Sequence, residues 1–410
     1  MTWWMQFNLF LNSRRLAYAW IAGGVLWFAW LISSLLGPGN MDLAGQVVGT
    51  DYLQFYTAGV TLRQGQSADL YNFSFQSQLE QTIAGKGLTN FHAFITPPFL
   101  AWLFVPLSYL PYTWSFIVWS LFSFVFLWAS IRLISTERTS KRFLWSLTWF
   151  PVFAAISFGQ NSLLSLLFLA LAYWLWRKEK YMMAGLVSSL LLYKPQMVLG
   201  LGLLWLLEWR KSWKSLFGLI LGGATLAGLC FWLLPDASRS YIDLARNFLP
   251  GLIYQDQFPL WHLHSLRGFW ILLFPGHVWL AEGLSMLFSI AGVVAYIYFW
   301  RVNRNKPDLL FAVAICLTIW ITPHAMIYDW SILLIPAILF WQAMPRLRTL
   351  WKPLIALIWI ATFLSGPLTY LQLKYLPIAV QISIPALIFS LYVYIKSILY
   401  GPSEELSVPS

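Results

Sequence analysis

The sequence has little charge and almost no cysteine. Only 10% of the 410 residues are Asp, Glu, Lys or Arg, whereas soluble globular proteins average roughly 25%. This deficit excludes an ordinary soluble globular protein. The two cysteines, Cys230 and Cys316, lie inside apolar runs and show no disulfide framework or metal-ligand spacing. We therefore expect no metal site and no cofactor.

Three further patterns are missing. The chain lacks the alternating segments of roughly ten residues that build an outer-membrane barrel. No internal repeat is visible, which argues against a transporter made of inverted repeats. No small-residue cleavage site follows the first apolar run, so we expect a retained first helix rather than a signal peptide.

What the chain does contain is long apolar runs separated by short basic clusters, with 59% hydrophobic and 19% aromatic residues. This pattern is typical of an all-α polytopic membrane protein. We expect one membrane domain over residues 1–400, with a bundle of about twelve transmembrane helices and a disordered cytoplasmic tail at 401–410. The predicted spans are 16–36, 113–133, 143–158, 159–176, 181–193, 195–209, 213–234, 278–300, 309–322, 326–343, 353–366 and 378–398.

The basic residues predict the orientation in the cytoplasmic membrane, because Lys and Arg collect in cytoplasmic loops. Most of the 26 cations fall in clusters that can all lie on one side, which predicts cytoplasmic termini and outer loops at 37–112 and 235–277. The net charge of +11 is thereby explained without a nucleic-acid partner. The proline-broken stretch 93–110 must then be re-entrant or interfacial, because only one further crossing fits before the next basic cluster.

Asp51 opens the segment "YLQFYTAGVTLRQG" in the first outer loop. In one interpretation Asp51 caps a helix that ends at Gly65. In the other, the segment is an amphipathic helix on the outer membrane surface. Asp51 would then lie where a lipid headgroup meets an aqueous substrate, and its carboxylate would accept a proton late, as a hydroxyl attacks.

Three polar residues interrupt apolar runs. Gln160 and Asn161 form an outer turn in "GQNSLL", where turn chemistry or a role facing a polar cavity explains them. Lys194, in "LLYKPQ", interrupts an apolar stretch that starts and ends in the cytoplasm, which places it at membrane depth. There it either faces a cavity or an anion such as phosphate, or extends to the outer interface.

Two other outer segments carry ionisable groups. His324 follows Pro323 at a helix break, with Tyr328 and Asp329 one turn further on. A lone histidine is more often structural, but an ionisable pair in an apolar zone is a functional candidate. His264 and Arg267 lie at the outer end of a short apolar run, where Arg267 either clamps a phosphate or sugar hydroxyl or anchors the interface.

Taken in order, these pieces resemble glycosyltransferase family 87, the GT-C-type polyprenol-phosphate-mannose-dependent mannosyltransferases of bacterial membranes. The resemblance covers most of the chain. It runs through Asp51 with "FYTAG", "DLY" at 69–71, "TPPFLAWLFVPLSYLP" at 96–111, "GQNSLL" at 159–164, "AGLVSSLLLYKPQ" at 184–196, "HSLRG" at 264–268 and "TPHAMIYDW" at 322–330.

The resemblance implies a GT-C-like helical bundle with its active site on the outer face. The implied donor is a polyprenyl-phosphate sugar, the acceptor a hydroxyl of a glycolipid or glycan, and the transfer inverting without an obligatory metal. By similarity Asp51 is the general base, and His324 lies beside the donor phosphate or assists proton transfer. Lys194 and Arg267 would offset charge on the leaving phosphate.

Two other functions share some of these features. A transporter or flippase of lipid-linked sugars also needs many helices and buried charges, but it would place them near mid-membrane around a symmetry axis. A lipid-linked oligosaccharide polymerase or ligase shares the topology and the donor chemistry. The candidate residues collect toward the outer face, which favours a transferase.

Overall fold

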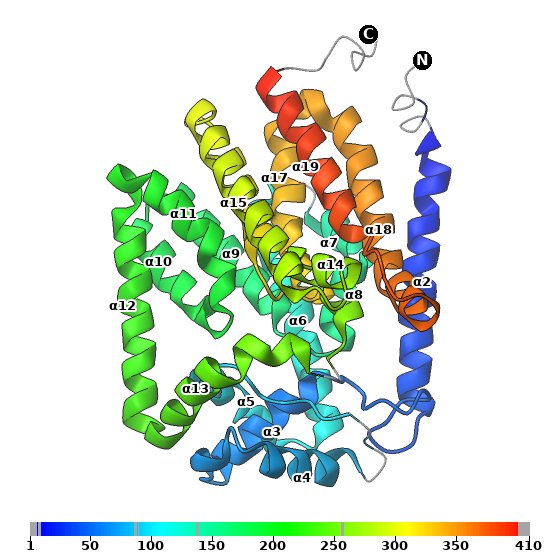
Figure 1. Cartoon of the computed structure of the whole chain (residues 1–410), viewed down its shortest axis with the longest axis vertical. Helices are drawn as coiled ribbons and strands as arrows, with labels where there is room; N and C mark the ends of the chain where they lie inside the picture. The colour runs from blue at the N-terminus through cyan, green and yellow to red at the C-terminus, as the bar shows by residue number, and fades with distance from the viewer. Residues whose placement is uncertain are drawn as a thin grey trace.

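The computed structural model describes residues 6, 10–85, 88, 90–136, 139–255 and 258–400, and within these ranges the chain is mostly helical, without β-strands. The expected disorder of 401–410 lies outside the described residues. The start of α2 and the end of α19 lie at one end of the molecule, here called the α2–α19 end. Helices α3, α4, α5 and α13 gather at the opposite end (Figure 1).

Five helices are long and apolar enough to cross a membrane. At about 1.5 Å per residue, each is longer than a hydrocarbon core of roughly 30 Å. They are α2 (Ser13–Leu36), α6 (Tyr112–Ile134), α12 (Trp209–Leu233), α15 (Val278–Val302) and α18 (Arg348–Tyr375). The prediction of an all-α multi-pass membrane protein is confirmed, whereas only part of the predicted twelve spans reach crossing length.

The remaining predicted spans are shorter helices, several broken at a polar motif. They are α8 (Phe150–Ser157), α9 (Ser162–Arg177), α10 (Tyr181–Ser189), η3 (Leu190–Tyr193), η4 (Pro195–Val198), α11 (Leu199–Leu207), α16 (Pro307–Ile321), η7 (Ile327–Leu333), α17 (Leu334–Ala343) and α19 (Ser383–Tyr400). Helices α8 and α9 meet at 120°, so together they form a bent span or a re-entrant pair. Such breaks are tolerated at membrane depth only where protein or water surrounds them.

The prediction of a single helix over 143–158 is wrong, because the chain divides there into α7 (Thr139–Leu147) and α8. Pro151 has no N–H to donate to the carbonyl of Leu147, so a continuous helix would lose that bond. The Leu147 carbonyl instead accepts a hydrogen bond of 2.8 Å from the indole of Trp27 on α2. The break thus frees an acceptor that attaches the first helix to the bundle.

The first of the two predicted outer loops, residues 37–112, folds into α3 (Tyr52–Arg63), η1 (Ser67–Asp69), α4 (Phe73–Ala84), α5 (Pro98–Phe104) and η2 (Leu107–Tyr109). Helix α5 has seven residues, so it is only about 10 Å long and does not cross a membrane. This length agrees with the prediction of a non-crossing segment at 93–110. The second loop contains α13 (Pro235–Asn247), η5 (Leu249–Tyr254), η6 (Leu260–His262) and α14 (Leu266–Leu273).

Helix α3 is not the amphipathic surface helix that its sequence predicts. Nearly all of its residues from Tyr52 to Thr61 are buried, on every side. The ring of Phe55 stacks on Phe104 of α5 at 5.0 Å between centroids, and Gly59 lets the two helices approach closely. The covering helix α5 comes about forty residues later, so the local pattern of α3 carried no sign of it.

Two buried apolar clusters organise the chain. The larger is built mainly from α8 to α11 and α16 to α19. The smaller joins α3, α5 and the first half of α6. Tyr328 belongs to the larger cluster, whereas Tyr52 and Tyr193 belong to the smaller. The candidate site lies where the two clusters meet.

Candidate active site

Asp51 is the residue immediately before α3, and its carboxylate makes no capping bond to that helix. The capping interpretation therefore does not account for it. The start of α3 is secured by backbone bonds instead, since the N–H of Tyr52 donates to the carbonyls of Gly49 at 2.7 Å and Phe158 at 2.9 Å. The carboxylate is left free to face the turn between α8 and α9.

That turn reaches Asp51 because Gly159 has no side chain. Gly159 has a φ of +67°, a conformation that glycine adopts without strain. A Cβ on Gly159 would lie 3.1 Å from the ring of Phe116 and would also collide with Tyr52. The carbonyl of Gly159 accepts a bond of 3.0 Å from the indole of Trp119. Close backbone packing thus presents the next residue, Gln160, to Asp51.

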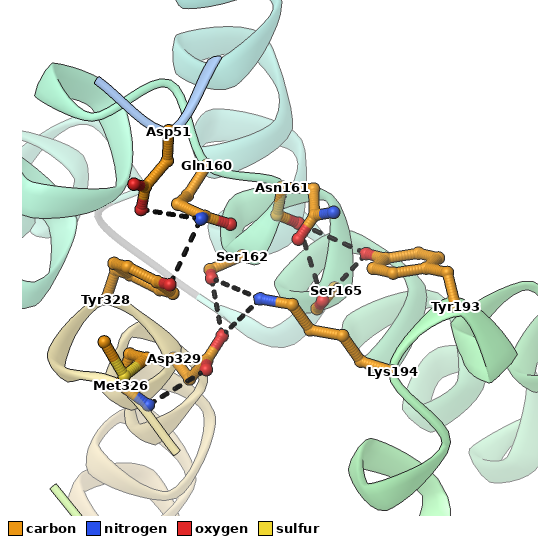
Figure 2. Close-up of polar contacts among 10 residues, drawn as sticks. All are labelled: Asp51, Gln160, Asn161, Ser162, Ser165, Tyr193, Lys194, Met326, Tyr328 and Asp329. Atoms are coloured by element: carbon orange, nitrogen blue, oxygen red, sulfur yellow. Dashed lines mark hydrogen bonds and ion pairs between the residues drawn. The ribbon is translucent and has the colours of Figure 1, made fainter. Parts of the chain in front are cut away.

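The Gln160 amide links two elements of the site. Its Nε2 donates to Asp51 Oδ2 at 2.8 Å and lies 3.1 Å from the Tyr328 hydroxyl oxygen (Figure 2). On the other side of the carboxylate, His92 Nδ1 is 3.7 Å from Asp51 Oδ1. The Asp51 side chain remains 23% exposed, so the carboxylate is held in place yet stays accessible to a substrate.

Two opposing effects set the charge of this carboxylate. Burial by itself raises the pKa of Asp51, but the hydrogen bond and charge of His92, assisted by Gln160, outweigh burial and lower the pKa below its ordinary value. Burial likewise lowers the pKa of His92, and the carboxylates of Asp51 and Glu80 more than reverse this, so that the pKa of His92 is raised. The arrangement keeps Asp51 ionised.

Glu80 completes this group from α4. Its Oε2 accepts a hydrogen bond of 3.0 Å from the backbone N–H of His92. Because Glu80 is fully buried, burial raises the pKa of its carboxyl to about 7, against the opposing effect of His92. Glu80 therefore fixes the backbone of His92 beside Asp51.

Lys194 and Asp329 form a buried ion pair, which Figure 2 draws below Asp51. Lys194 lies between η3 and η4, and its Nζ is 2.7 Å from Asp329 Oδ1 (Figure 2). The two side chains are 13% and 3% exposed. Ser162 donates its hydroxyl to the same Asp329 oxygen at 2.7 Å, and the backbone N–H of Met326 donates to Oδ2 at 3.2 Å. The Asp329 carboxylate thus links the break between η3 and η4, the start of α9 and the start of η7.

The start of α9 carries a second set of polar contacts. The Tyr193 hydroxyl is 2.8 Å from Ser165 Oγ and donates to the Asn161 carbonyl at 3.2 Å (Figure 2). Asn161 is fully buried, and neither polar atom of its side chain has a hydrogen-bond partner among the described residues. The predicted polar turn is therefore built into the site.

Three predicted residues lie outside this network. The His324 ring packs against Phe258 at 5.4 Å between centroids, and its surroundings include the charges of Lys194, Asp329 and Arg267. Arg267 is paired with Glu282, at 2.7 Å from Nε and 2.6 Å from Nη2.

His264 is the third predicted residue outside the network. It is fully buried, with Nδ1 at 2.7 Å from the Ser383 hydroxyl oxygen. Its backbone carbonyl accepts a bond of 2.9 Å from the indole of Trp330, the residue after Asp329. His264 thus holds η7 against the loop that contains α13 and α14.

The sequence analysis did not single out His92. The available signal was a histidine four residues before "TPP", in the same outer loop as Asp51. A separation of about forty residues gave no reason to pair the two. Among the described residues, no group of three or more His, Cys, Asp or Glu side chains is placed to hold a metal ion.

The sequence pattern of glycosyltransferase family 87 matches residues 94–323, more than half of the chain. The protein belongs to glycosyltransferase family 87. This family 87 member is a membrane glycosyltransferase, which confirms the class of enzyme predicted from the sequence. The matched region contains Gln160, Lys194 and Arg267, begins after Asp51 and ends one residue before His324. No curated protein and no solved structure matches the chain.

Proposed function

We propose that this enzyme transfers a hexose, expected to be mannose, from a polyprenyl-phosphate sugar to a hydroxyl of a glycolipid or glycan acceptor. Asp51 is the general base. One observation carries the proposal: a partly exposed carboxylate is kept ionised by His92 and oriented by Gln160, and Tyr328 links this group to a largely buried lysine, whose Nζ lies 5.1 Å from the centroid of the Tyr328 ring. That combination suits a reaction that removes a proton and releases a phosphate.

The transfer is written as a single displacement with inversion. The acceptor oxygen attacks the anomeric carbon while the bond from that carbon to the phosphate oxygen breaks. The electron pair of the broken bond leaves with the polyprenyl phosphate, and the hydroxyl proton goes to Asp51. Because Asp51 is a weak base, the proton moves late, once the new bond has acidified the hydroxyl.

Lys194 is proposed to stabilise the leaving phosphate. An ammonium group has three donors, and Asp329 and Ser162 take two of those of Lys194. The third is available for a phosphate oxygen. Arg267 has five N–H donors, and those not used by Glu282 serve the same purpose. His324 is proposed to lie beside the phosphate or to assist proton transfer.

Tyr328, Gln160 and Asn161 line the proposed substrate site, whereas His264 supports the segment that carries Tyr328. The elements of the Asp51 loop lie at the end of the molecule opposite the α2–α19 end (Figure 1). With both termini in the cytoplasm, as the basic clusters predict, Asp51 opens to the outer face of the cytoplasmic membrane.

The test is transfer of labelled mannose from polyprenyl-phosphate mannose, measured with purified Asp51→Asn protein and a panel of acceptor lipids. Loss of a general base lowers the rate roughly 10²- to 10⁴-fold. Asp69→Asn is the matched control, because Asp69 lies in the same loop and its carboxylate accepts a bond only from the nearby Asn72 side chain among the contacts described. Full activity of correctly folded Asp51→Asn protein would contradict the assignment.

A further inference from the structure

Helix α2 contacts the bundle at its middle and leaves a cleft beside its first half. Gly23 packs so closely on α7–α8 that a Cβ would lie 3.0 Å from the Cα of Thr148. One turn later the Trp27 indole donates to the Leu147 carbonyl at 2.8 Å. Towards its start, α2 lines a cavity of about 760 Å³ together with α7, α17, α18 and α19. That volume lies within the range of ligand sites, roughly 300–1,000 Å³.

The wall of this cleft is mainly apolar and rich in tryptophan. Five tryptophans line it: Trp145, Trp149, Trp341, Trp351 and Trp359. Three of their indole N–H groups are already bonded within the protein. Trp149 donates to Thr362 at 3.0 Å, Trp351 to Ala337 at 3.1 Å and Trp359 to Thr148 at 2.9 Å. The wall therefore suits a hydrocarbon chain, which needs no hydrogen bonds.

The mouth of the cleft is basic. Its basic lining residues are Arg15 in the first turn of α2, Lys141 and Arg142 in the first turn of α7, and Lys352 near the start of α18, and no Asp or Glu is among the lining residues described. Arg15 also places its guanidinium 3.8 Å from the ring centroid of Phe10. A basic mouth above an apolar wall is complementary to a lipid with a negatively charged headgroup.

We propose that the cleft binds an anionic phospholipid from the leaflet at the α2–α19 end, with its phosphate at Arg15, Lys141 and Lys352 and an acyl chain along the tryptophans. The site is separate from the candidate active site, because neither Asp51 nor Lys194 lines it. The bound lipid bridges α2 to α7 and α18. It stabilises the folded enzyme by mass action, as any ligand of the native state does.

The experiment uses the full-length protein, delipidated in detergent and then titrated with phosphatidylglycerol or phosphatidylcholine of identical acyl chains. Bound lipid is counted by native mass spectrometry and the thermal midpoint is recorded in parallel. We expect phosphatidylglycerol to be retained selectively and to raise the midpoint. Each Lys or Arg near an anionic lipid contributes roughly a fivefold change in binding. The variant Arg15→Gln/Lys141→Gln/Lys352→Gln should therefore bind phosphatidylglycerol at least tenfold more weakly.

A charge-matched control separates the cleft from general surface attraction. Lys211→Gln/Lys214→Gln/Arg301→Gln removes the same number and kinds of cations from exposed positions that do not line the cleft, and it should retain the lipid. Ala356→Trp fills the cleft without changing its charge, so this variant should no longer retain the lipid. Equal retention of the two lipids, equal losses in the two triple variants, or polyprenyl phosphate as the species retained would overturn the proposal.

Discussion

The buried pair of Lys194 and Asp329 permits a test that separates stability from catalysis. Removing the ammonium in Lys194→Met leaves the Asp329 carboxylate, 3% exposed, without its counter-ion. Breaking a buried pair in this way costs about 3–5 kcal/mol. The lower part of that range applies here, because Ser162 and the Met326 N–H still donate to the carboxylate, each contributing about 1 kcal/mol.

The double variant Lys194→Met/Asp329→Asn removes the stranded charge. Its amide oxygen can still accept from the Met326 N–H, and its NH2 group can donate to the Ser162 hydroxyl, which no longer accepts from Lys194. We expect the double variant to regain most of the stability lost by the single variant. Thermal unfolding of the purified proteins in one detergent measures this recovery. Lys211→Met is the control, since the Lys211–Glu208 pair is 3.5 Å long with Lys211 65% exposed, and such a surface pair contributes at most about 1 kcal/mol.

Activity gives the second measurement. If Lys194 stabilises the leaving phosphate, the double variant stays inactive although its stability has returned. If activity returns together with stability, Lys194 is only a counter-ion and its proposed catalytic role is wrong. An unchanged unfolding midpoint in Lys194→Met would refute the structural reasoning itself.

Three other predictions concern the charge of the base, helix packing and metals. In His92→Gln the pKa of Asp51 rises, because burial is no longer opposed by the imidazolium. The acid limb of the pH–rate profile should move to higher pH, and an unshifted limb would contradict the pairing. Gly185→Val drives a side chain into the backbone carbonyl of Ser215, where α10 meets α12, and should cost at least about 1–3 kcal/mol by denaturation. Gly202→Val, which meets nothing within 4 Å, should cost less. Transfer activity assayed after EDTA treatment should be unchanged, and a loss restored by a divalent cation would show that a metal is required.

Much of the architecture follows from the sequence alone. Apolar runs longer than a bilayer core, with few charges, have no stable alternative to helices in a membrane. Helices α2, α6, α12 and α15 therefore appear within a few residues of their predicted bounds. The helix breaks at Lys194-Pro195 and Pro323 could also be predicted from the sequence, because proline interrupts the helical hydrogen-bond ladder.

The composition of the site was decided by tertiary contacts. Asp51 and Gln160 were both candidates, but their bond depends on Gly159 packing against Tyr52. The sequence left open whether Lys194 faces a cavity or an anion or extends to the outer interface, and the fold pairs it with the nearby carboxylate of Asp329.

His92 shows most clearly what the sequence alone could not predict. Only the folding of the loop brings its imidazole beside the Asp51 carboxylate. Local patterns report on chain geometry over a few turns of helix. The sequence by itself therefore determined a helical membrane protein and a set of polar breaks in it. Which of those breaks meet, and with which charges, depended on contacts between residues about forty to 170 positions apart.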